Sequence, residues 1–422
     1  MPIRRLAILC FHTSPLASLG GEKTGGMNVY VKELAQEFAR RGIHVDIFTR
    51  RADVVSPEID VSIDQYARVI HIPAGPPQTL LPEGVYPHRQ EFASGVIAFA
   101  TRYNIQYDLI YAHYWLSGLV AAILREVWGT PFVQMFHTLG EMKNRISTSR
   151  SVRIFPDIRI DSELKLANQA DRIIAATPAE QAQLRWLYRT PRQKISIIPP
   201  GVNTNIFSPI PSKNARSILG LPSRMKHFLY AGRIEPLKAV DTILYALSYI
   251  KNQSPDLFSD LRFTVIGGDP RHANPELLSL QLLTKKLGLE KHVSYVGAKS
   301  QAELPAYYSA SLAVIMPSDY ESFGMVALEA MACGTPVIAT QVGGLAYLVR
   351  EQETGFLVPV RDPDALAQRM MWLIRNPETA SKMGSTAAQL AQNYTWAAIA
   401  DQLLSNFDDL LNRRMSWVYQ QQ

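Results

Sequence analysis

The fold is decided by the stretch Glu321-Ser322-Phe323-Gly324-Met325-Val326-Ala327-Leu328-Glu329, which follows the apolar segment Leu312–Met316. The apolar segment predicts a buried strand, and the apolar residues after Gly324 predict a helix, so a polar loop joins the two. The first backbone N–H groups of such a helix can bind phosphate. Glu321, in the loop, can hold a pair of sugar hydroxyls, and Glu329, inside the helix, can reach a ribose. We therefore interpret this stretch as part of a nucleotide-sugar site.

The alternation of strand, loop and helix continues along the whole chain. In the first half, the expected strands are Leu6–Phe11, Val45–Arg50, Val69–Ala74, Asp108–His113, Pro131–His137, Arg172–Thr177 and Ile195–Ile198. In the second half, they are Phe228–Ala231, Leu261–Gly267, Val293–Val296, Leu312–Met316, Pro336–Ala339 and Gly355–Val358. Pro199-Pro200-Gly201 separates the halves, because proline stops both helices and strand ladders. The pattern predicts an α/β protein with two Rossmann-like, doubly wound parallel-sheet domains that face a central cleft.

Length and composition agree with this organisation. The 422 residues fit two domains, and the 47% hydrophobic and 19% charged content is typical of a packed protein. We place the first domain at residues 1–203, together with C-terminal helices at about 396–422, and the second at residues 204–395. No apolar run approaches the roughly 20 residues that span a bilayer. Cys10 and Cys333 fall in core segments, which favours a reducing cytoplasm. The formal charge of +6 comes from scattered residues, so no nucleic-acid partner is expected.

Glycines and histidines follow several strands of the first domain. Gly25 and Gly26 precede a helix that begins near Gly26, where the backbone can approach a diphosphate or phosphosugar closely. His12, His113 and His137 each stand at the end of a predicted strand. Because the carboxyl ends of parallel strands share one edge, and ligands bind at that edge, these histidines indicate a site.

Two cations follow the strand Phe228–Ala231 in the second domain. Arg233 can grip a phosphate with two parallel hydrogen bonds, and Lys238 adds a point charge. A diphosphate leaving group needs such neutralisation while its bond to the sugar breaks, and two cations can replace a metal there. Asp362-Pro363-Asp364 reads as D-x-D, but its place before an amphipathic segment predicts a helix cap. We therefore expect no metal and no other cofactor.

From residue 6 to about 400, the chain resembles the retaining glycosyltransferases of the GT-B fold. It is similar to the branch that holds sucrose-phosphate synthases and the inositol-phosphate N-acetylglucosaminyltransferases of mycothiol synthesis. The superfamily is indicated by Glu321 and Glu329 together with Gly232-Arg233 and Lys238. The branch is indicated by four segments, His12-Thr13-Ser14-Pro15, Gly25-Gly26-Met27-Asn28-Val29-Tyr30-Val31, His113-Tyr114-Trp115-Leu116-Ser117-Gly118 and His137-Thr138-Leu139-Gly140.

The resemblance implies roles for individual residues. Arg233 and Lys238 neutralise the donor diphosphate, and Glu321 holds the transferred sugar, with His137 near it. The other implied donor contacts are Gly25, Gly26, Gly267, Val296, Phe323, Gly324, Met325, Val326 and Glu329, with Glu329 on the ribose and residues 295–298 along the uracil. The implied contacts to a phosphorylated acceptor are Asn28, Tyr114, Thr138 and Arg159.

One loop departs from both named families, which usually carry a phosphate-binding lysine near Leu80–Gly84. Here the loop reads Thr79-Leu80-Leu81-Pro82-Glu83-Gly84. His88 and Arg89, which follow this loop, are the candidate replacements on the acceptor side.

The resemblance implies transfer at the front face of the sugar, with retention of configuration. The leaving diphosphate would itself accept the proton of the acceptor. We favour transfer of glucose from UDP-glucose to fructose 6-phosphate, giving sucrose 6-phosphate. The alternative is transfer of N-acetylglucosamine from its UDP derivative to inositol phosphate, since Met27 replaces the glutamine usual in sucrose-phosphate synthases.

Two further alternatives belong to other classes of protein. An NAD-dependent dehydrogenase is disfavoured, because no G-x-G-x-x-G fingerprint follows the first strand. A non-catalytic nucleotide-binding protein is disfavoured by the set of acceptor-side residues.

Overall fold

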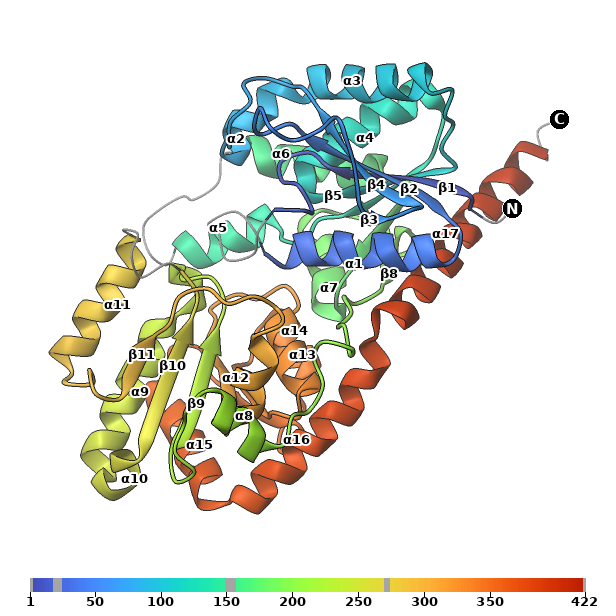
Figure 1. Ribbon diagram of the computed structural model, residues 1–422. Coiled ribbons are helices and arrows are strands. Elements are labelled where there is room, and N and C mark those ends of the chain that lie inside the picture. Colours follow the sequence, from blue (N-terminus) through green and yellow to red (C-terminus); the bar gives the residue numbers. More distant parts are fainter. Residues whose placement is uncertain (1–2, 18–24, 149–156, 269–273, 420–422) are drawn as a thin grey trace. The chain divides into compact units, whose positions relative to one another are not determined.

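The computed structural model describes residues 3–17, 25–148, 157–268 and 274–419 (Figure 1). These residues form two compact units. The first comprises residues 3–17, 26–148, 157–199 and 396–419, and the second comprises Gly25 and residues 200–268 and 274–395. The sequence had placed the boundary between the domains at 203/204.

The first unit contains an eight-stranded sheet in the order β3-β4-β2-β1-β5-β6-β7-β8. Its strands are β1 (Arg5–Cys10), β2 (His44–Arg50), β3 (Ile59–Asp64), β4 (Ala67–Ile72), β5 (Leu109–His113), β6 (Phe132–Met135), β7 (Arg172–Ala175) and β8 (Ile195–Ile197). Every strand predicted for this half is confirmed, and these strands all pair in parallel.

The sequence prediction missed β3, which pairs antiparallel with β4 at the edge of the sheet. The strand faces solvent along much of its length, and Val61 is 68% exposed. The predicted strands were recognised as buried apolar runs, and β3 has only the weaker alternation of a half-exposed strand.

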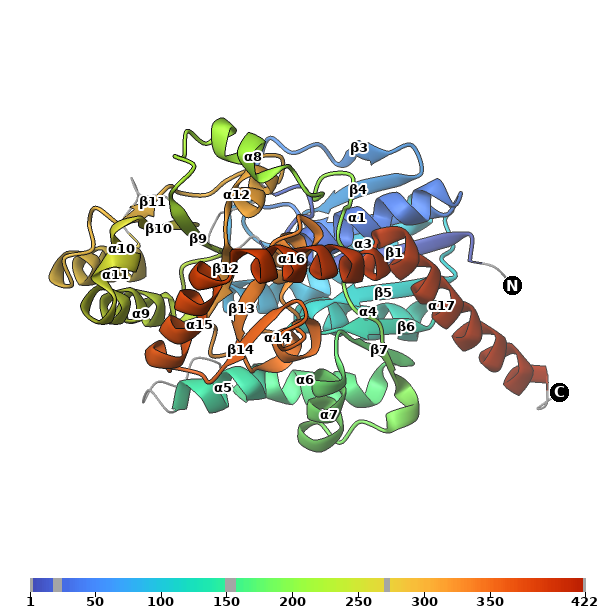
Figure 2. The ribbon, with the colours of Figure 1, turned by 90° about the horizontal axis from the view of Figure 1, so that it is seen from below.

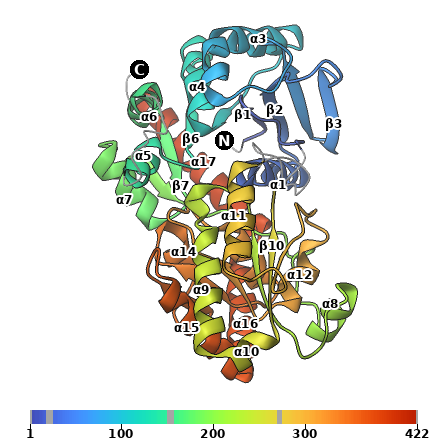
Figure 3. The ribbon, with the colours of Figure 1, turned by 90° about the vertical axis from the view of Figure 1, so that its left-hand side faces the viewer.

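Helices flank the first sheet. They are α1 (Gly26–Arg40), α2 (Pro82–Val85), α3 (Arg89–Arg102), α4 (Tyr114–Trp128), α5 (Gly140–Thr148), α6 (Asp157–Gln169), α7 (Pro178–Leu187) and α17 (Trp396–Tyr419), with the 3-10 turns η1 (Tyr86–His88) and η2 (Arg192–Lys194). Ala7, Leu9 and Phe11 share a core cluster with residues of α3 and α4, which lie side by side (Figure 3). Neighbouring residues of a strand face opposite sides, so the intervening residues of β1 face away from this cluster.

The last helix, α17, packs on α1 although most of the chain separates them. The ring of Phe407 lies 6.4 Å from that of Phe38 in α1 and 5.3 Å from that of Tyr111 in β5. Arg41 forms an ion pair of 2.8 Å with Asp401. The C-terminal helix therefore supplies part of the hydrophobic core of the first unit.

The second unit is built on a six-stranded sheet in the order β11-β10-β9-β12-β13-β14, in which all pairs are parallel. Its strands are β9 (Lys226–Ala231), β10 (Leu261–Ile266), β11 (Val293–Tyr295), β12 (Ala313–Met316), β13 (Val337–Thr340) and β14 (Gly355–Val358). All of them were predicted from the sequence.

The helices of the second unit pack as two groups. They are α8 (Ser212–Ile218), α9 (Val240–Gln253), α10 (Pro255–Ser259), α11 (Pro275–Lys286), α12 (Leu304–Ala310), α13 (Met325–Ala332), α14 (Gly343–Leu348), α15 (Pro363–Arg375) and α16 (Pro377–Ala391), with the 3-10 turns η3 (Pro236–Lys238) and η4 (Gln392–Tyr394). Residues of α9, α10, α11 and α15 form one core cluster with the strands, and α10 and α11 lie beside α9 (Figure 2). In the other group, α12 contacts α8 and α13, and α13 contacts α16. The helix α16 also contacts α15, and its Ala380 and Met383 belong to the core cluster, so it joins the two groups.

Both cysteines, Cys10 and Cys333, are buried free thiols in these cores. Among the helices of the described residues, none combines the length and the hydropathy that a membrane crossing requires.

The packing of α17 gives a test of the first unit. Phe407→Ala removes a fully buried ring, and loss of such a ring costs about 3–5 kcal/mol of unfolding free energy. We expect a lower midpoint of urea unfolding, measured by circular dichroism. Gln402→Ala, at an exposed position of the same helix, is the control and should leave the midpoint unchanged. Equal midpoints for the two variants would contradict a core role for α17.

Candidate active site

In the second unit, the neighbouring strands β9 and β10 end at glycines that lie against each other. The φ angles of Gly232 and Gly267 are 148° and 142°, which side-chain-bearing residues rarely adopt. A Cβ atom on Gly267 would collide with the carbonyl oxygen of Gly232. Glycine at the predicted donor contact Gly267 is therefore required for the two strand ends to approach.

Two predicted catalytic residues, Lys238 and Glu321, come together at this edge. Lys238 ends the turn η3 after β9, and Glu321 lies in the loop between β12 and α13. The Nζ atom of Lys238 lies 2.5 Å from Oε2 of Glu321, and each side chain is only 17% exposed. The lysine charge is thus balanced by a carboxylate within the unit.

The loop that carries Glu321 is fixed by backbone contacts on several sides. The N–H of Asp319 donates to the carbonyl of Leu237 at 2.9 Å, which joins this loop to η3. The N–H of Gly344, in the first turn of α14, donates to the carbonyl of Glu321 at 3.0 Å. A Cβ atom on Gly344 would clash with Phe323, so α14 approaches the loop closely because a glycine stands there.

The helix α13 begins directly after Gly324, whose φ of 100° is again in the left-handed region. Met325 and Val326 form the first turn of this helix, as predicted. Within the helix, the buried carboxylate of Glu329 accepts a hydrogen bond of 3.0 Å from the hydroxyl of Tyr308. Burial and the adjacent Glu329 raise the pKa of Tyr308 well above its ordinary value, so this hydroxyl remains a donor.

Of the remaining predicted donor residues, Arg233, Gly25 and Val296 belong to the second unit, whereas Gly26 is the first residue of α1 in the first unit. Arg233 is half-exposed and pairs with Glu235 at 2.7 Å. Gly25 is grouped with the second unit, where a Cβ atom on it would lie 3.8 Å from Nε of Arg233. Val296 follows β11, and its N–H donates to Val265 at 3.1 Å.

In the first unit, His113 is the last residue of β5, and His137 follows the neighbouring strand β6. The two side chains form a hydrogen-bonded pair. Nδ1 of His113 lies 2.9 Å from Nε2 of His137, so one ring donates and the other accepts. The ring of Tyr30 stands edge-on to both, at 5.5 and 5.3 Å. Burial, with a smaller effect of His12, lowers the pKa of His137 to about 3, and burial together with His137 lowers the pKa of His113 well below its ordinary value. Both imidazoles are therefore neutral at pH 7.

Backbone strain marks the same strand ends. His137, after β6, has a φ of 61°, and Tyr114, after β5, has a φ of 75°. Residues other than glycine rarely adopt this region, at a cost of about 1–3 kcal/mol each. Strain of this kind gathers at functional sites, where the surrounding structure enforces it.

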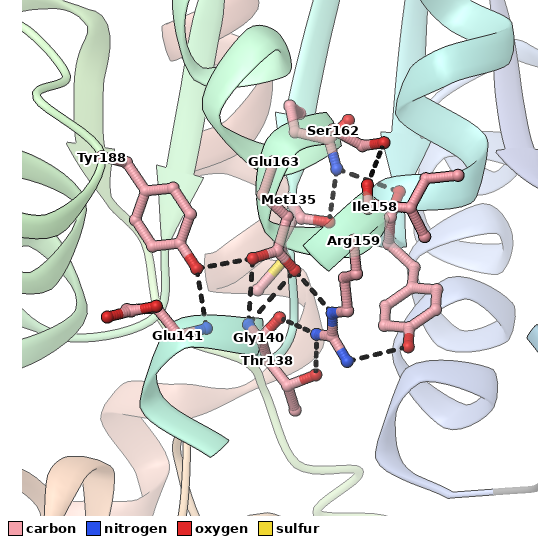
Figure 4. A network of polar contacts seen from close by, with 11 residues as sticks. Met135, Thr138, Gly140, Glu141, Ile158, Arg159, Ser162, Glu163 and Tyr188 are labelled. Atoms are coloured by element: carbon pink, nitrogen blue, oxygen red, sulfur yellow. Dashed lines mark hydrogen bonds and ion pairs between the residues drawn. The ribbon is translucent and has the colours of Figure 1, made fainter. Parts of the chain in front are cut away.

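Arg159 contacts two other predicted acceptor residues, Tyr114 and Thr138, and Figure 4 shows its contact with Thr138. Its guanidinium donates to the hydroxyl of Tyr114 at 3.1 Å and to the carbonyl and hydroxyl of Thr138 at 2.8 and 3.0 Å. Its Nε donates to Glu163 at 2.7 Å, and Arg159 is only 1% exposed. The structure thus brings Tyr114, Thr138 and Arg159 together, but as a buried network rather than an open cationic surface.

Glu163 and Tyr188 belong to this network, and the sequence prediction missed both. Glu163 accepts from the N–H of Gly140 at 2.9 Å and from the hydroxyl of Tyr188 at 2.5 Å (Figure 4). A Cβ atom on Gly140 would lie 3.1 Å from Arg159, which explains the glycine at the start of α5. The spacing of four residues between Arg159 and Glu163 on a predicted helix is a signal that could have revealed the ion pair.

The other predicted acceptor residues have different partners. The buried amide of Asn28 donates to the hydroxyl of Thr13 at 3.1 Å and to the carbonyl of Ser14 at 2.7 Å. Nδ1 of His88 lies 3.4 Å from Glu91. The guanidinium of Arg89 lies over the ring of Tyr86, at 4.2 Å. His88 and Arg89 thus contact side chains of their own segment.

The residues described here include no group of three His, Cys, Asp or Glu side chains that could hold a metal ion. The D-x-D sequence has the structural role predicted for it. Asp362 caps α15, and its carboxylate accepts a hydrogen bond of 2.9 Å from the N–H of Ala365.

Two α/β units built on parallel sheets are the architecture of glycosyltransferases of the GT-B fold. Residues 24–206 match the family described as Glycosyltransferase Family 4, and residues 211–390 match Glycosyl transferases group 1. The chain belongs to the glycosyltransferase group 1 family of GT-B proteins. This membership leaves the dehydrogenase alternative without support.

Named relatives resemble almost the whole chain. It is 38% identical over 412 residues to D-inositol 3-phosphate glycosyltransferase of Kineococcus radiotolerans, covering 95% of this chain and 94% of the relative. The protein of the same name from Corynebacterium diphtheriae is 37% identical, with coverage of 97% and 95%. The structure of sucrose-phosphate synthase from Thermosynechococcus elongatus superposes with a TM-score of 0.89 at 33% identity, covering 97% of this chain and all of that one.

The neutral histidine pair predicts a pH dependence of stability. The unfolded chain protonates these histidines near pH 6.5, whereas the folded pKa of His137 is about 3. The unfolded state therefore binds more protons below pH 6.5, so the pair's contribution is complete above pH 6.5 and is lost as the pH falls toward 3.

We expect each such histidine to steepen the fall in unfolding free energy by about 1.4 kcal/mol per pH unit in this range. Urea unfolding between pH 7.5 and 4.5 measures the slope. His113→Gln should give a shallower slope than the wild type, and His44→Gln, at an exposed position, should not. An unchanged slope in His113→Gln would show that this histidine is not buried in its neutral form.

Proposed function

We propose that this glycosyltransferase moves a hexosyl group from a UDP-sugar to a hydroxyl of inositol phosphate, with retention of configuration. The main support is the likeness, over 95% of the chain, to relatives named D-inositol 3-phosphate glycosyltransferase. The hydroxyls of Tyr114 and Thr138 accept hydrogen bonds from the buried guanidinium of Arg159, and each can in turn donate to a phosphate.

Fructose 6-phosphate, with UDP-glucose as donor, is the second candidate. The sequence motifs led us to favour it, and the likeness to sucrose-phosphate synthase at a TM-score of 0.89 supports it. The identity to that protein is 33%, against 38% for the inositol-phosphate relative, and we therefore place inositol phosphate first.

The proposed mechanism uses the residues of the second unit for the donor. The diphosphate takes the place of Glu321 as the partner of Lys238, and Arg233 adds a second cation. Glu321 is then available for the sugar hydroxyls, while Glu329 binds the ribose. As the bond to the sugar breaks, negative charge grows on the diphosphate, and the two cations stabilise it more strongly than in the ground state. The acceptor hydroxyl attacks the face of the sugar from which the diphosphate leaves, so no protein nucleophile is required. The diphosphate accepts the proton of this hydroxyl, so no protein base is required either.

On the acceptor side, we assign the phosphate to Tyr114, Thr138 and Arg159. His137 is assigned to the transferred sugar. As a neutral imidazole it can exchange hydrogen bonds with a hydroxyl without adding charge to the transition state.

Removal of the cation Arg233 tests the donor assignment. Arg233→Ala should lower turnover roughly 100-fold or more, about 3 kcal/mol, because it supports charge that develops in the transition state. Arg224→Ala, which removes an exposed arginine paired with Asp260, is the control and should turn over normally. EDTA should leave the wild-type rate unchanged. Loss of activity in EDTA, restored by manganese, would contradict a metal-free mechanism.

A matrix of substrates tests the acceptor. UDP-glucose and UDP-N-acetylglucosamine are each offered with inositol phosphate, inositol, fructose 6-phosphate and fructose, and products are identified by mass spectrometry. We expect a product with inositol phosphate and none with free inositol. Product only with fructose 6-phosphate would establish the second candidate instead. Equal use of phosphorylated and unphosphorylated acceptors would contradict a phosphate site.

The same assay tests the phosphate contacts. The test variant is Tyr114→Phe, because it removes only one hydroxyl. Arg159→Ala is not suitable, because it would leave Glu163 buried without its cation and would destabilise the fold. Hydrogen bonds to charged groups contribute about 1.5–3 kcal/mol, so Tyr114→Phe should raise the acceptor KM about tenfold. Its affinity for UDP, measured by calorimetry, should not change.

A further inference from the structure

Arg361 stands in the turn between β14 and α15, outside every motif that the sequence indicated. Its φ of 57° is in the left-handed region, so the backbone accepts strain to place this side chain. The guanidinium forms ion pairs with two carboxylates from distant parts of the chain, Asp319 and Asp241.

These contacts use the whole fork of the guanidinium. Nε and Nη2 donate to the two oxygens of Asp319 at 2.8 and 2.7 Å. Nη1 donates to both oxygens of Asp241 at 2.8 Å, and Nη2 also reaches the carbonyl of Pro236 at 3.3 Å. Such paired bonds fix orientation as well as distance, which a lysine ammonium cannot do.

The groups that Arg361 holds belong to the two segments that carry the donor residues. Asp319 stands in the loop of Glu321, where its own N–H also bonds to Leu237 of η3. Pro236 begins η3, which ends at Lys238, and Asp241 lies in the first turn of the helix α9 that follows. A single side chain is therefore bonded both to the segment that carries Lys238 and to the loop that carries Glu321.

We propose that Arg361 is a positioning residue of the donor site, which holds the segments of Lys238 and Glu321 in register so that the diphosphate meets a preformed cation. This inference rests on the proposed role of Lys238 in binding the diphosphate. Arg361 acts through Asp319 and Asp241 and does not itself touch the donor. Arg361 therefore supports UDP binding through the geometry of its paired hydrogen bonds, and a positive charge without that geometry is not sufficient for UDP binding.

UDP binding, measured by titration calorimetry, tests the proposal without any assumption about the acceptor. The variants are Arg361→Ala, Arg361→Lys, Asp319→Asn and the double variant Arg361→Ala/Asp319→Asn, with Lys238→Ala as reference. The matched control is Arg369→Ala, because Arg369 is also paired with a carboxylate, Glu351, and is 37% exposed against 32% for Arg361. Circular dichroism and thermal midpoints confirm that each variant is folded at the temperature of the titration.

We expect Arg361→Ala and Asp319→Asn each to weaken UDP binding at least tenfold, and the double variant to bind as weakly as either single one, since both remove the same link. Arg361→Lys should behave like Arg361→Ala. Wild-type affinity in Arg361→Lys would mean that only the positive charge attracts UDP, and would overturn the proposal. Arg369→Ala should bind within twofold of the wild type.

The reference variant separates this inference from the proposed function. If Lys238→Ala loses UDP affinity while Arg361→Ala keeps it, even with a lowered thermal midpoint, Arg361 is merely structural and the inference is wrong. If neither change affects UDP binding, Lys238 does not bind the diphosphate, and both the donor assignment and the inference fail. In the transfer assay, Arg361→Ala should lower kcat and leave the acceptor KM unchanged, because Arg361 positions donor residues and not acceptor residues.

Discussion

All strands of the second sheet run in one direction, and the candidate donor site depends on this constraint. Because β9 and β12 are neighbours, the loops that follow them leave the sheet side by side, and these loops carry Lys238 and Glu321. The segments after β13 and β14 leave at the same edge of the sheet. The first of them leads to the glycines at the start of α14, and the second carries Arg361. Residues more than 80 positions apart in sequence therefore meet as a consequence of topology.

Both units pair a candidate phosphate-binding cation with a carboxylate of their own. Lys238 has Glu321, and Arg159 has Glu163, the latter pair almost fully removed from solvent. A buried cation without a partner would be costly, so the carboxylates make these positions tolerable in the absence of a phosphate. To replace the carboxylate as the partner of such a cation, a phosphate must bind the cation more strongly. Its additional oxygens and its larger negative charge allow this.

Much of this arrangement could be predicted from the sequence, because parallel strands covered on both faces read as buried apolar runs. The half-exposed β3 was missed for the same reason. The motifs also identified Lys238, Glu321 and the network of Tyr114, Thr138 and Arg159, but not which atoms would meet. Glu163, Tyr188 and Arg361 escaped because their partners are set by the order of strands and the packing of helices. The cap at Asp362 was recognised because capping depends on local sequence alone.

The packing of α17 on the first unit has a consequence for synthesis on the ribosome. Residues 200–395 emerge as one continuous segment and can form their own sheet and cores as soon as they leave the exit tunnel. The earlier segment still lacks Trp396 and Phe407, which cover Tyr30, Phe38 and Tyr111. Translation usually lets N-terminal domains fold first. In this chain, the unit that begins first is completed last, so its exposed aromatic face needs protection until translation ends.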